Sequence, residues 1–118
     1  MKVLVCGSRR FIDPFTASLT IDARIGQLPS GTTVIHGGAL GADQIAAEAA
    51  TRTGHLVQAF YADWDTHGKK AGIIRNLKML DENPAFVLAF WNGESRGTMH
   101  TITVARKRGI PVEIVPLV

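Results

Sequence analysis

The chain of 118 residues is poor in cysteine, aromatic side chains and long apolar runs. Cys6 is the single cysteine, so an internal disulfide is excluded, and a reducing compartment is the natural setting. No apolar run approaches the roughly 18 residues that a membrane-spanning helix requires. The first residues lack the basic segment and the small-residue cleavage site of a signal peptide. These absences predict a soluble cytoplasmic protein that makes no membrane contact.

The residues that are present have the composition of an ordinary globular domain, with 46% hydrophobic and 19% charged residues. The length suits a single domain over residues 1–118 and leaves little room for a second one. The formal net charge is +3, a mild excess whose placement matters more than its sum. Basic residues gather at 69–78 and at 96–108. They form either solvated helix faces or a basic rim around an anionic ligand.

Short apolar runs alternate with helical patterns along the whole chain. Expected strands cover 3–6, 32–35, 56–60, 86–90 and 112–115, and expected helices begin near 14, 42, 68 and 98. A polar loop is expected over 63–68. The run at 86–90 is the most apolar and predicts the central strand. The alternation favours a parallel sheet, because parallel strands need crossover connections.

The predicted fold is therefore an α/β, Rossmann-like, three-layer domain with a five-stranded parallel sheet and about four flanking helices. The predicted strand order is 3-2-1-4-5, with a switch point between the first and fourth strands. Ligands of such sheets bind beyond the carboxyl ends of the strands at this point. Three unusual segments follow strand ends, at residues 7–9, 36–43 and 92–98. We expect the functional site to be built from them.

The segment His36-Gly37-Gly38-Ala39-Leu40-Gly41-Ala42-Asp43 carries the most information. Three glycines between a strand and a helix allow positive φ angles and a close approach of a ligand to the main chain. The amides and the dipole at the helix start favour an anion such as phosphate. The pattern is neither a Walker loop nor the G-x-G-x-x-G dinucleotide fingerprint. It predicts a phosphate-bearing ligand on this turn, unless the turn is only a tight connection.

Asp43 introduces a conflict at this turn, because its carboxylate would repel a phosphate bound to the same helix start. Two arrangements would resolve the conflict. In the first, Asp43 caps the helix and the phosphate lies to one side. In the second, Asp43 turns inward to a ribose hydroxyl or to a basic partner, for which Arg9 and Arg75 are the candidates.

Further ligand-binding candidates lie near the other strand ends and at the third helix. Gly97-Thr98 offers a glycine and a hydroxyl, although it is also an ordinary helix entry. Arg75 can grip a phosphate through two donors, and Trp64 either stacks on a base or anchors its loop. The remaining candidates are Gly7, Ser8, Arg9, Lys69 and Asn76.

Catalytic and metal-binding patterns are weaker than the binding patterns. No set of nucleophile, base and orienting residue is readable, and whether the protein is an enzyme stays open. The catalytic candidates are Asp43, Arg75 and Glu94. The four histidines show no ligand spacing, so neither a metal nor a cofactor is expected. Cys6 has no evident activating neighbour and is expected in the core.

A combination of motifs over nearly the whole chain resembles the YspA-like branch of the SLOG superfamily, named after the Smf/DprA and LOG proteins. The motifs are Gly7-Ser8-Arg9 with Asp13, the run HGGALGAD, Trp64, the run GKKAG with Arg75-Asn76, and Gly97-Thr98. The resemblance implies a Rossmann-like domain, from a bacterium or a phage, that binds a nucleotide-type ligand at the glycine-rich turn. By family analogy it also implies a homodimer.

The resemblance leaves three functions to compare. The first is a binding or sensor module for a small nucleotide-derived ligand. The second is a phosphoribohydrolase or other N-glycosidase, because LOG enzymes cleave the base–ribose bond with a PGGxGTxxE motif. This chain departs from that motif at His36, at Ala42 and near Ile45, which favours the binding module. The third, single-stranded nucleic-acid binding as in DprA, is the least favoured because stacking aromatics are few.

Overall fold

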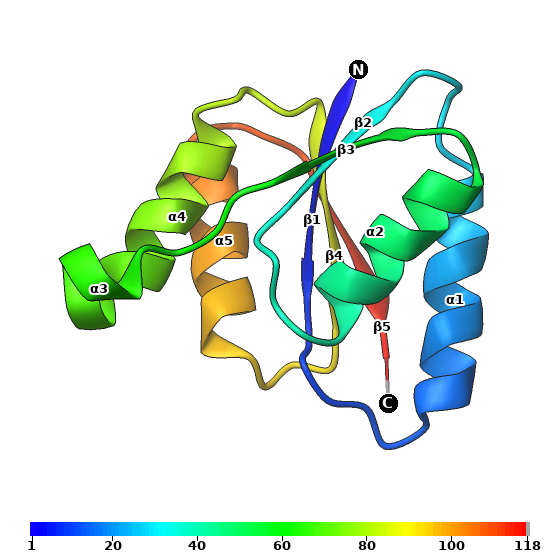
Figure 1. Cartoon of the computed structure of the whole chain (residues 1–118), viewed down its shortest axis with the longest axis horizontal. Coiled ribbons are helices and arrows are strands. Elements are labelled where there is room, and N and C mark those ends of the chain that lie inside the picture. Colours follow the sequence, from blue (N-terminus) through cyan, green and yellow to red (C-terminus); the bar gives the residue numbers. More distant parts are fainter. Residues whose placement is uncertain (118) are drawn as a thin grey trace.

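The computed structural model describes residues 1–117 and shows a parallel five-stranded sheet between two helical layers (Figure 1). The strands are β1 (Lys2–Gly7), β2 (Thr33–His36), β3 (Leu56–Ala59), β4 (Phe86–Trp91) and β5 (Val112–Pro116). Their order is β3-β2-β1-β4-β5, which confirms the prediction. The central strand is β1, and the prediction that 86–90 forms the centre is wrong by one place. Strands covered on both faces are similarly apolar, so hydrophobicity alone does not show which strand lies at the centre of the sheet.

Two helices cover each face of the sheet. Helices α1 (Pro14–Gly26) and α2 (Ala42–Arg52) lie on one face, and α4 (Ala71–Leu80) and α5 (Arg96–Lys107) lie on the other (Figure 1). None of the helices within residues 1–117 is long and apolar enough to span a membrane.

A single helical turn, α3 (Trp64–His67), and a 3-10 turn (Gly68–Lys70) precede α4. The sequence predicts a polar loop at this point, and that prediction is wrong for residues 64–67. The carboxylate of Asp63 accepts the amide of Thr66 at 3.1 Å. This cap stabilises one turn of helix in an otherwise polar segment.

The helix ends follow their capping residues. The carboxylate of Asp13 accepts the amide of Thr16 at 3.1 Å, so α1 begins where the sequence places it. Helix α5 begins two residues before the expected Thr98. The hydroxyl of Ser95 accepts the amide of Thr98 at 3.3 Å, and this cap starts the helix at Arg96.

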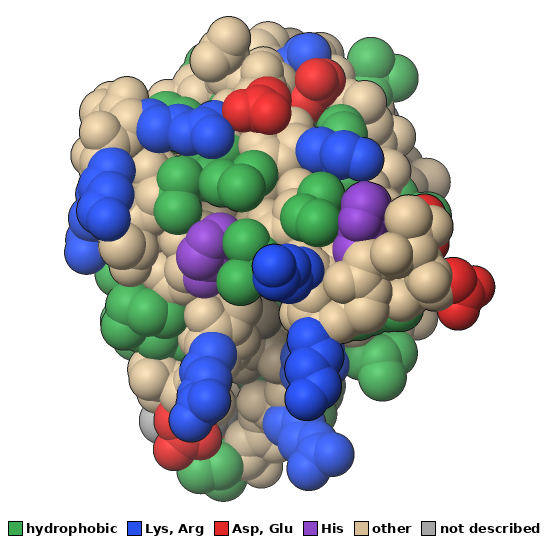
Figure 2. Space-filling model, turned by 90° about the vertical axis from the view of Figure 1, so that its left-hand side faces the viewer, with side chains coloured by type: hydrophobic (Ala, Val, Ile, Leu, Met, Phe, Trp, Pro, Cys, Tyr) green, Lys and Arg blue, Asp and Glu red, His purple; other side chains and the backbone are tan. Residues whose placement is uncertain are grey.

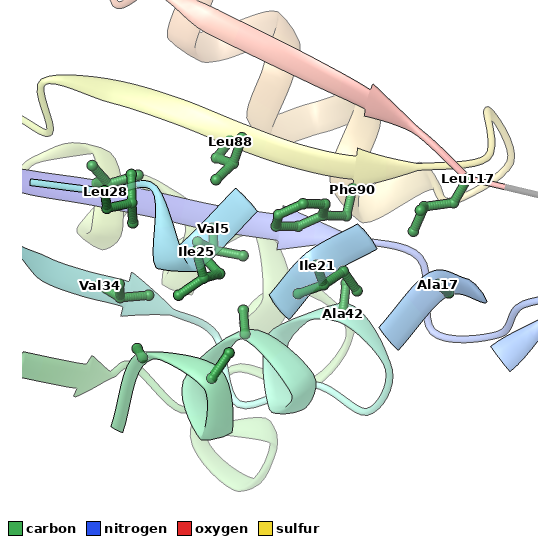
Figure 3. Close-up of a cluster of buried hydrophobic side chains, with 14 residues drawn as sticks. Val5, Ala17, Ile21, Ile25, Leu28, Val34, Ala42, Leu88, Phe90 and Leu117 are labelled. Carbon is green, nitrogen blue, oxygen red and sulfur yellow. The ribbon is translucent and has the colours of Figure 1, made fainter. Parts of the chain in front are cut away.

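Two hydrophobic clusters fill the space between the sheet and the helices. Val5 and Phe90 pack with Ile21 beneath α1 and α2 (Figure 3). Leu4 packs with Met79 beneath α4 and α5. Successive residues of β1 therefore enter opposite clusters, as the twofold period of a strand requires. Because both faces of β1 are buried, its sequence is a continuous apolar run.

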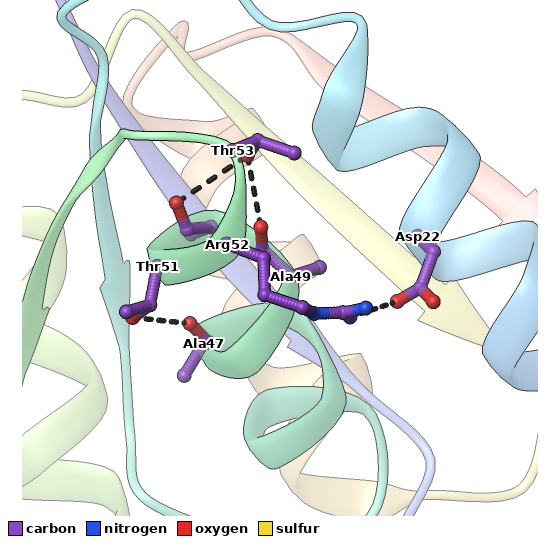
Figure 4. Close-up of polar contacts among 7 residues, drawn as sticks. Asp22, Ala47, Ala49, Thr51, Arg52 and Thr53 are labelled. Carbon is purple, nitrogen blue, oxygen red and sulfur yellow. Dashed lines mark hydrogen bonds and ion pairs between the residues drawn. The ribbon is translucent and has the colours of Figure 1, made fainter.

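Surface contacts fix the carboxyl end of α2 against α1 (Figure 4). The guanidinium of Arg52 lies 3.0 Å from the carboxylate of Asp22 on α1. The hydroxyl of Thr51 donates to the carbonyl of Ala47 at 3.0 Å within the last turns of α2. An exposed ion pair contributes at most about 1 kcal/mol, so these contacts orient the helix more than they stabilise it. The other end of α2 carries Asp43.

Candidate functional site

A pocket of about 400 Å³ opens at the carboxyl ends of β1 and β4, where the predicted switch point lies. Its walls come from the loop after β1, the glycine-rich turn, α4 and the loop into α5. The volume is in the range of small-molecule sites. The pocket brings together these candidates from the sequence: Gly7, Ser8, Arg9, Ala39, Asp43, Arg75, Asn76, Glu94, Gly97 and Thr98.

Other sequence candidates lie outside the pocket lining. Within the glycine-rich turn these are His36, Gly37, Gly38, Gly41 and Ala42. Trp64 is 54% exposed on α3, and Lys69 is exposed on the 3-10 turn. Neither side chain lines the pocket.

Seven further residues line the pocket that the sequence did not single out as ligand contacts. Asn92, Ser95 and Arg96 lie within the expected segment 92–98, and the others are Cys6, Arg10, Met79 and Thr101. The doublet Arg9-Arg10 directly after a strand end was an available indication of a basic pocket rim. Ser95, which caps α5, was another, because serine is a preferred residue at helix starts.

The carboxylate of Asp43 closes the glycine-rich turn. Its Oδ2 atom accepts the amide of Gly37 at 3.0 Å and the amide of Ala39 at 3.3 Å. The cap position of α2 is occupied by Gly41, so Asp43 does not cap the helix. Of the two arrangements expected for Asp43, the structure excludes the first, in which it caps the helix. The partners inside this protein are backbone amides rather than a basic side chain.

Two further amides of the turn also donate within the protein. The amide of Gly38 donates to Nδ1 of His36 at 3.0 Å. The amide of Ala42 donates to the carbonyl of Ser8 at 3.0 Å, which ties α2 to the end of β1. The sequence-based expectation that this turn presents free amides to an anion is therefore wrong for positions 37, 38, 39 and 42.

Burial controls the protonation of Asp43. The residue is 6% exposed, and burial raises the pKa of its carboxyl to about 6. The two amide hydrogen bonds and the charges of Arg75 and Arg9 lower the pKa and offset part of this effect. A carboxyl group that titrates near neutrality inside a pocket is a typical feature of functional sites.

The raised pKa of Asp43 predicts a pH-dependent difference between the native protein and Asp43→Asn. The folded state holds the proton more tightly than the unfolded state, so the resulting stability is present below pH 4. It is lost as the pH rises through 6. We expect the free energy of unfolding of the native protein, relative to the variant, to fall by about 2 kcal/mol between pH 4 and 7.

Chemical denaturation of both proteins at a series of pH values measures this difference. Burial lowers the pKa of His36, and that group loses stabilising effect as the pH falls. Because both proteins contain His36, its contribution cancels in the difference. A difference that stays flat from pH 4 to 7 would show that Asp43 titrates as an ordinary aspartate.

Arg75 is fixed by two acceptors. Its Nη1 atom donates to the carbonyl of Gly37 at 2.6 Å, and its Nε atom donates to Oδ1 of Asn76 at 2.9 Å. Burial lowers the pKa of the half-buried guanidinium, and the nearby charge of Asp43 raises it. Within residues 1–117, Arg75 and Asp43 form no ion pair shorter than 4.0 Å. The guanidinium therefore keeps donors that no described carboxylate occupies.

The pocket has an excess of positive charge. Lys and Arg side chains flank a hollow on the face that includes α4 and α5 (Figure 2). The ionisable lining consists of the arginines Arg9, Arg10, Arg75 and Arg96 and the acids Asp43 and Glu94. Such a concave cationic surface concentrates anionic ligands, and guanidinium groups match the geometry of phosphate.

The hydroxyl groups of Ser8 and Thr98 hold the pocket walls together. Thr98 Oγ1 donates to the carbonyl of Gly7 at 3.0 Å and lies 3.0 Å from Ser95 Oγ. Ser8 Oγ accepts the amide of Asn92 at 3.0 Å. Both contacts join the end of β1 to the loop and helix that follow β4. The sequence predicts that these hydroxyls contact a phosphate. The structure shows another role for them, because their hydrogen bonds hold the pocket walls together.

The pocket lining also includes the buried, uncharged residues Cys6, Met79 and Thr101. Cys6 is 7% exposed, and burial raises the pKa of its thiol. A thiol in this state stays protonated and unreactive. Within residues 1–117, no group of three His, Cys, Asp or Glu side chains is placed to hold a metal ion.

Comparisons with known proteins connect this geometry to a family. The model of the YspA, cpYpsA-related SLOG family matches residues 1–67. The Gene 61 protein of Mycobacterium phage D29 is 41% identical to this chain over 116 residues, which cover 94% of this chain and 93% of that protein.

Two solved structures are similar to the fold. DNA processing protein A (DprA) from Streptococcus pneumoniae superimposes with a TM-score of 0.78 at 21% identity, over 98% of this chain and 50% of DprA. The structural genomics target TM1055 superimposes with a TM-score of 0.73 at 22% identity, over 94% of this chain and 71% of that protein. The chain thus spans about half the length of DprA, and these two similarities show the fold.

Proposed function

This chain belongs to the YspA, cpYpsA-related SLOG family, and we propose that it binds a phosphate-bearing nucleotide or nucleotide-derived ligand as a binding or sensor module. The observation that carries the proposal is the pocket at the carboxyl ends of β1 and β4, with four arginines and one buried carboxyl group in its lining. The glycine-rich turn at 36–43 forms one wall of this pocket through Ala39 and Asp43.

The phosphate belongs on the arginine side of the pocket rather than on the amides of the glycine-rich turn. Four of those amides already donate within the protein, and the carboxylate of Asp43 in the first turn of α2 would repel a phosphate, whereas the first turn of α5 has no acidic residue. The amides of Arg96 and Gly97, at the start of the 12-residue helix α5, have no acceptor within residues 1–117. A helix start with free amides and a positive dipole end favours a phosphate group. Arg75 approaches the same region through its link to Asn76.

Asp43 provides an acceptor for a different part of the ligand. An ionised carboxylate only accepts hydrogen bonds, and the two described bonds of Asp43 both end on Oδ2. Within residues 1–117, Oδ1 has no hydrogen-bond donor. An acceptor beside several cations suits a sugar hydroxyl close to a phosphate. A nucleotide carries both groups, whereas inorganic phosphate carries only one of them.

Isothermal titration with nucleoside monophosphates, ADP-ribose and NAD tests the proposal. We expect binding of at least one of these ligands, and a decrease in affinity of about tenfold in Arg96→Ala, because a hydrogen bond to a charged group is lost. Arg52→Ala is the matched control, since Arg52 is exposed on α2 and outside the pocket. Absence of binding by all three ligand classes, or an equal loss in the control, would refute the proposal.

A second candidate function is hydrolysis of the base–ribose bond of a nucleotide. The carboxyl group of Asp43, with its pKa near 6, could exchange a proton with a bound ligand at neutral pH. Chromatography of nucleoside monophosphates incubated with the pure protein would detect a released base. Release that is lost in Asp43→Asn while binding persists supports hydrolysis, and absence of release from every ribonucleotide tested rules it out.

A further inference from the structure

We infer that Asn76 is a positioning residue, whose side-chain amide holds the guanidinium of Arg75 and the first turn of α5 in one fixed arrangement. The inference rests on the proposed function, because these are the groups assigned to the phosphate. Asn76 lies on α4 and is 4% exposed, so its amide is almost entirely surrounded by protein. A buried amide without partners would be strongly unfavourable.

Both ends of the Asn76 amide are used, and they join two helices. Oδ1 accepts a hydrogen bond from Nε of Arg75 at 2.9 Å. Nδ2 donates to the carbonyl of Gly97 at 3.4 Å and lies 3.4 Å from Nδ1 of His100. Gly97 and His100 both belong to α5. The contacts therefore run from the arginine on α4 to the helix start that faces the pocket.

The chain of contacts also reaches the glycine-rich turn. Nη1 of Arg75 donates to the carbonyl of Gly37 at 2.6 Å. A continuous hydrogen-bonded path thus connects Gly37, Arg75, Asn76 and Gly97. It runs from the turn after β2 to the helix after β4. If Asn76 were removed, Arg75 would keep one anchor and lose the link to α5.

The position of Asn76 also determines how Arg75 can meet an anion. A guanidinium can grip an oxyanion through the edge formed by Nε and one Nη, or through the edge formed by the two Nη atoms. Asn76 occupies Nε, so the first edge is used inside the protein. The Gly37 carbonyl takes one hydrogen of Nη1, so within residues 1–117 Nη2 is the nitrogen without an acceptor, and it remains for the ligand. A side chain that is already ordered loses less conformational freedom on binding.

The first measurement follows the Nε–H resonance of Arg75 by NMR in the full chain. We expect a resolved, slowly exchanging resonance that disappears in Arg75→Lys, which assigns it. In Asn76→Ala the resonance should exchange as fast as those of exposed arginines. In Asn76→Asp, which keeps the acceptor and loses the donor, the Arg75 resonance should persist while the amide resonances of Gly97 and its neighbours shift.

The control for general destabilisation is Thr32→Val. Thr32 is fully buried, and its hydroxyl donates to the carbonyl of Pro29 at 2.6 Å, before β2 and away from the pocket. This variant should lose stability without affecting the resonance of Arg75. If Asn76→Ala leaves that resonance unchanged, or if Thr32→Val broadens it to the same extent, the inference is wrong.

The second measurement is titration with inorganic phosphate. We expect Asn76→Ala to bind phosphate about tenfold more weakly than the native protein, because Arg75 must first be ordered, whereas Thr32→Val should bind as tightly as the native protein. Equal affinities in the native protein and Asn76→Ala would overturn the positioning role. If the native protein binds neither phosphate nor any nucleotide, the proposed function fails, and the Arg75 resonance alone decides whether Asn76 holds the guanidinium.

Discussion

Replacement of Gly41 by alanine is expected to lower the free energy of unfolding by about 4 kcal/mol, from backbone strain and overpacking together. Gly41 has φ 82° and ψ −123°, a conformation that side chains rarely adopt. A Cβ atom there would lie 2.5 Å from the carbonyl oxygen of Ser8 and 2.6 Å from the Cα atom of Arg9. The loop cannot easily retreat, because the Ser8 carbonyl accepts the amide of Ala42. Guanidinium denaturation measures the loss.

Gly54→Ala is the matched control for this substitution. Gly54 has a similar φ of 80°, but nothing lies within 4 Å of an added Cβ atom. Its replacement should therefore show backbone strain alone, about 1 kcal/mol. If the free energy of unfolding falls by the same amount in both variants, the close contact between the glycine-rich turn and the loop after β1 does not contribute to the effect at Gly41.

The largest expected effect on binding is at Arg75. Arg75→Met should weaken the affinity for the nucleotide found by titration about a hundredfold, because charged hydrogen bonds contribute about 1.5–3 kcal/mol. The substitution also leaves the carbonyl of Gly37 without its donor. It removes a charge that lowers the pKa of Asp43, so the carboxyl group should titrate at a higher pH than in the native protein.

Two further variants define the role of Arg75. Arg75→Lys keeps the charge and loses the planar pair of donors, so an intermediate loss of affinity is expected. Arg106→Met removes an exposed arginine near the far end of α5 and should leave binding unchanged. A change of less than threefold in Arg75→Met would exclude Arg75 from the ligand site.

The arrangement of the sheet was predictable because it depends on local patterns that repeat. Apolar runs and capping residues such as Asp13 mark the elements, and parallel strands leave few strand orders to consider. The sequence also placed the glycine-rich turn correctly, at the carboxyl ends of the strands. The helical turn at 64–67 was not predicted, since one capping carboxylate in a polar segment decides it.

The internal chemistry of the site could not be predicted from the sequence, because it depends on directions that tertiary packing sets. Asp43 could equally have capped α2, and only the path of the turn brings its carboxylate to the amides of Gly37 and Ala39. The bond from Arg75 to Gly37 joins residues 38 positions apart. No local pattern reports such a contact. Asn76 was a candidate for its position beside Arg75, and its link to α5 required the structure.

The burial of the one thiol has a practical consequence for studying this protein. Cys6 lines the pocket and is 7% exposed, and burial raises the pKa of its thiol, so the thiol is protonated. A thiol-specific reagent must enter the pocket to reach it, so the labelling rate of the native chain reports access to the pocket. Any molecule that fills the pocket blocks this access, so the labelling rate falls in proportion to the unoccupied fraction of the pocket. The chain thus contains its own reporter for ligand screening, with no added probe.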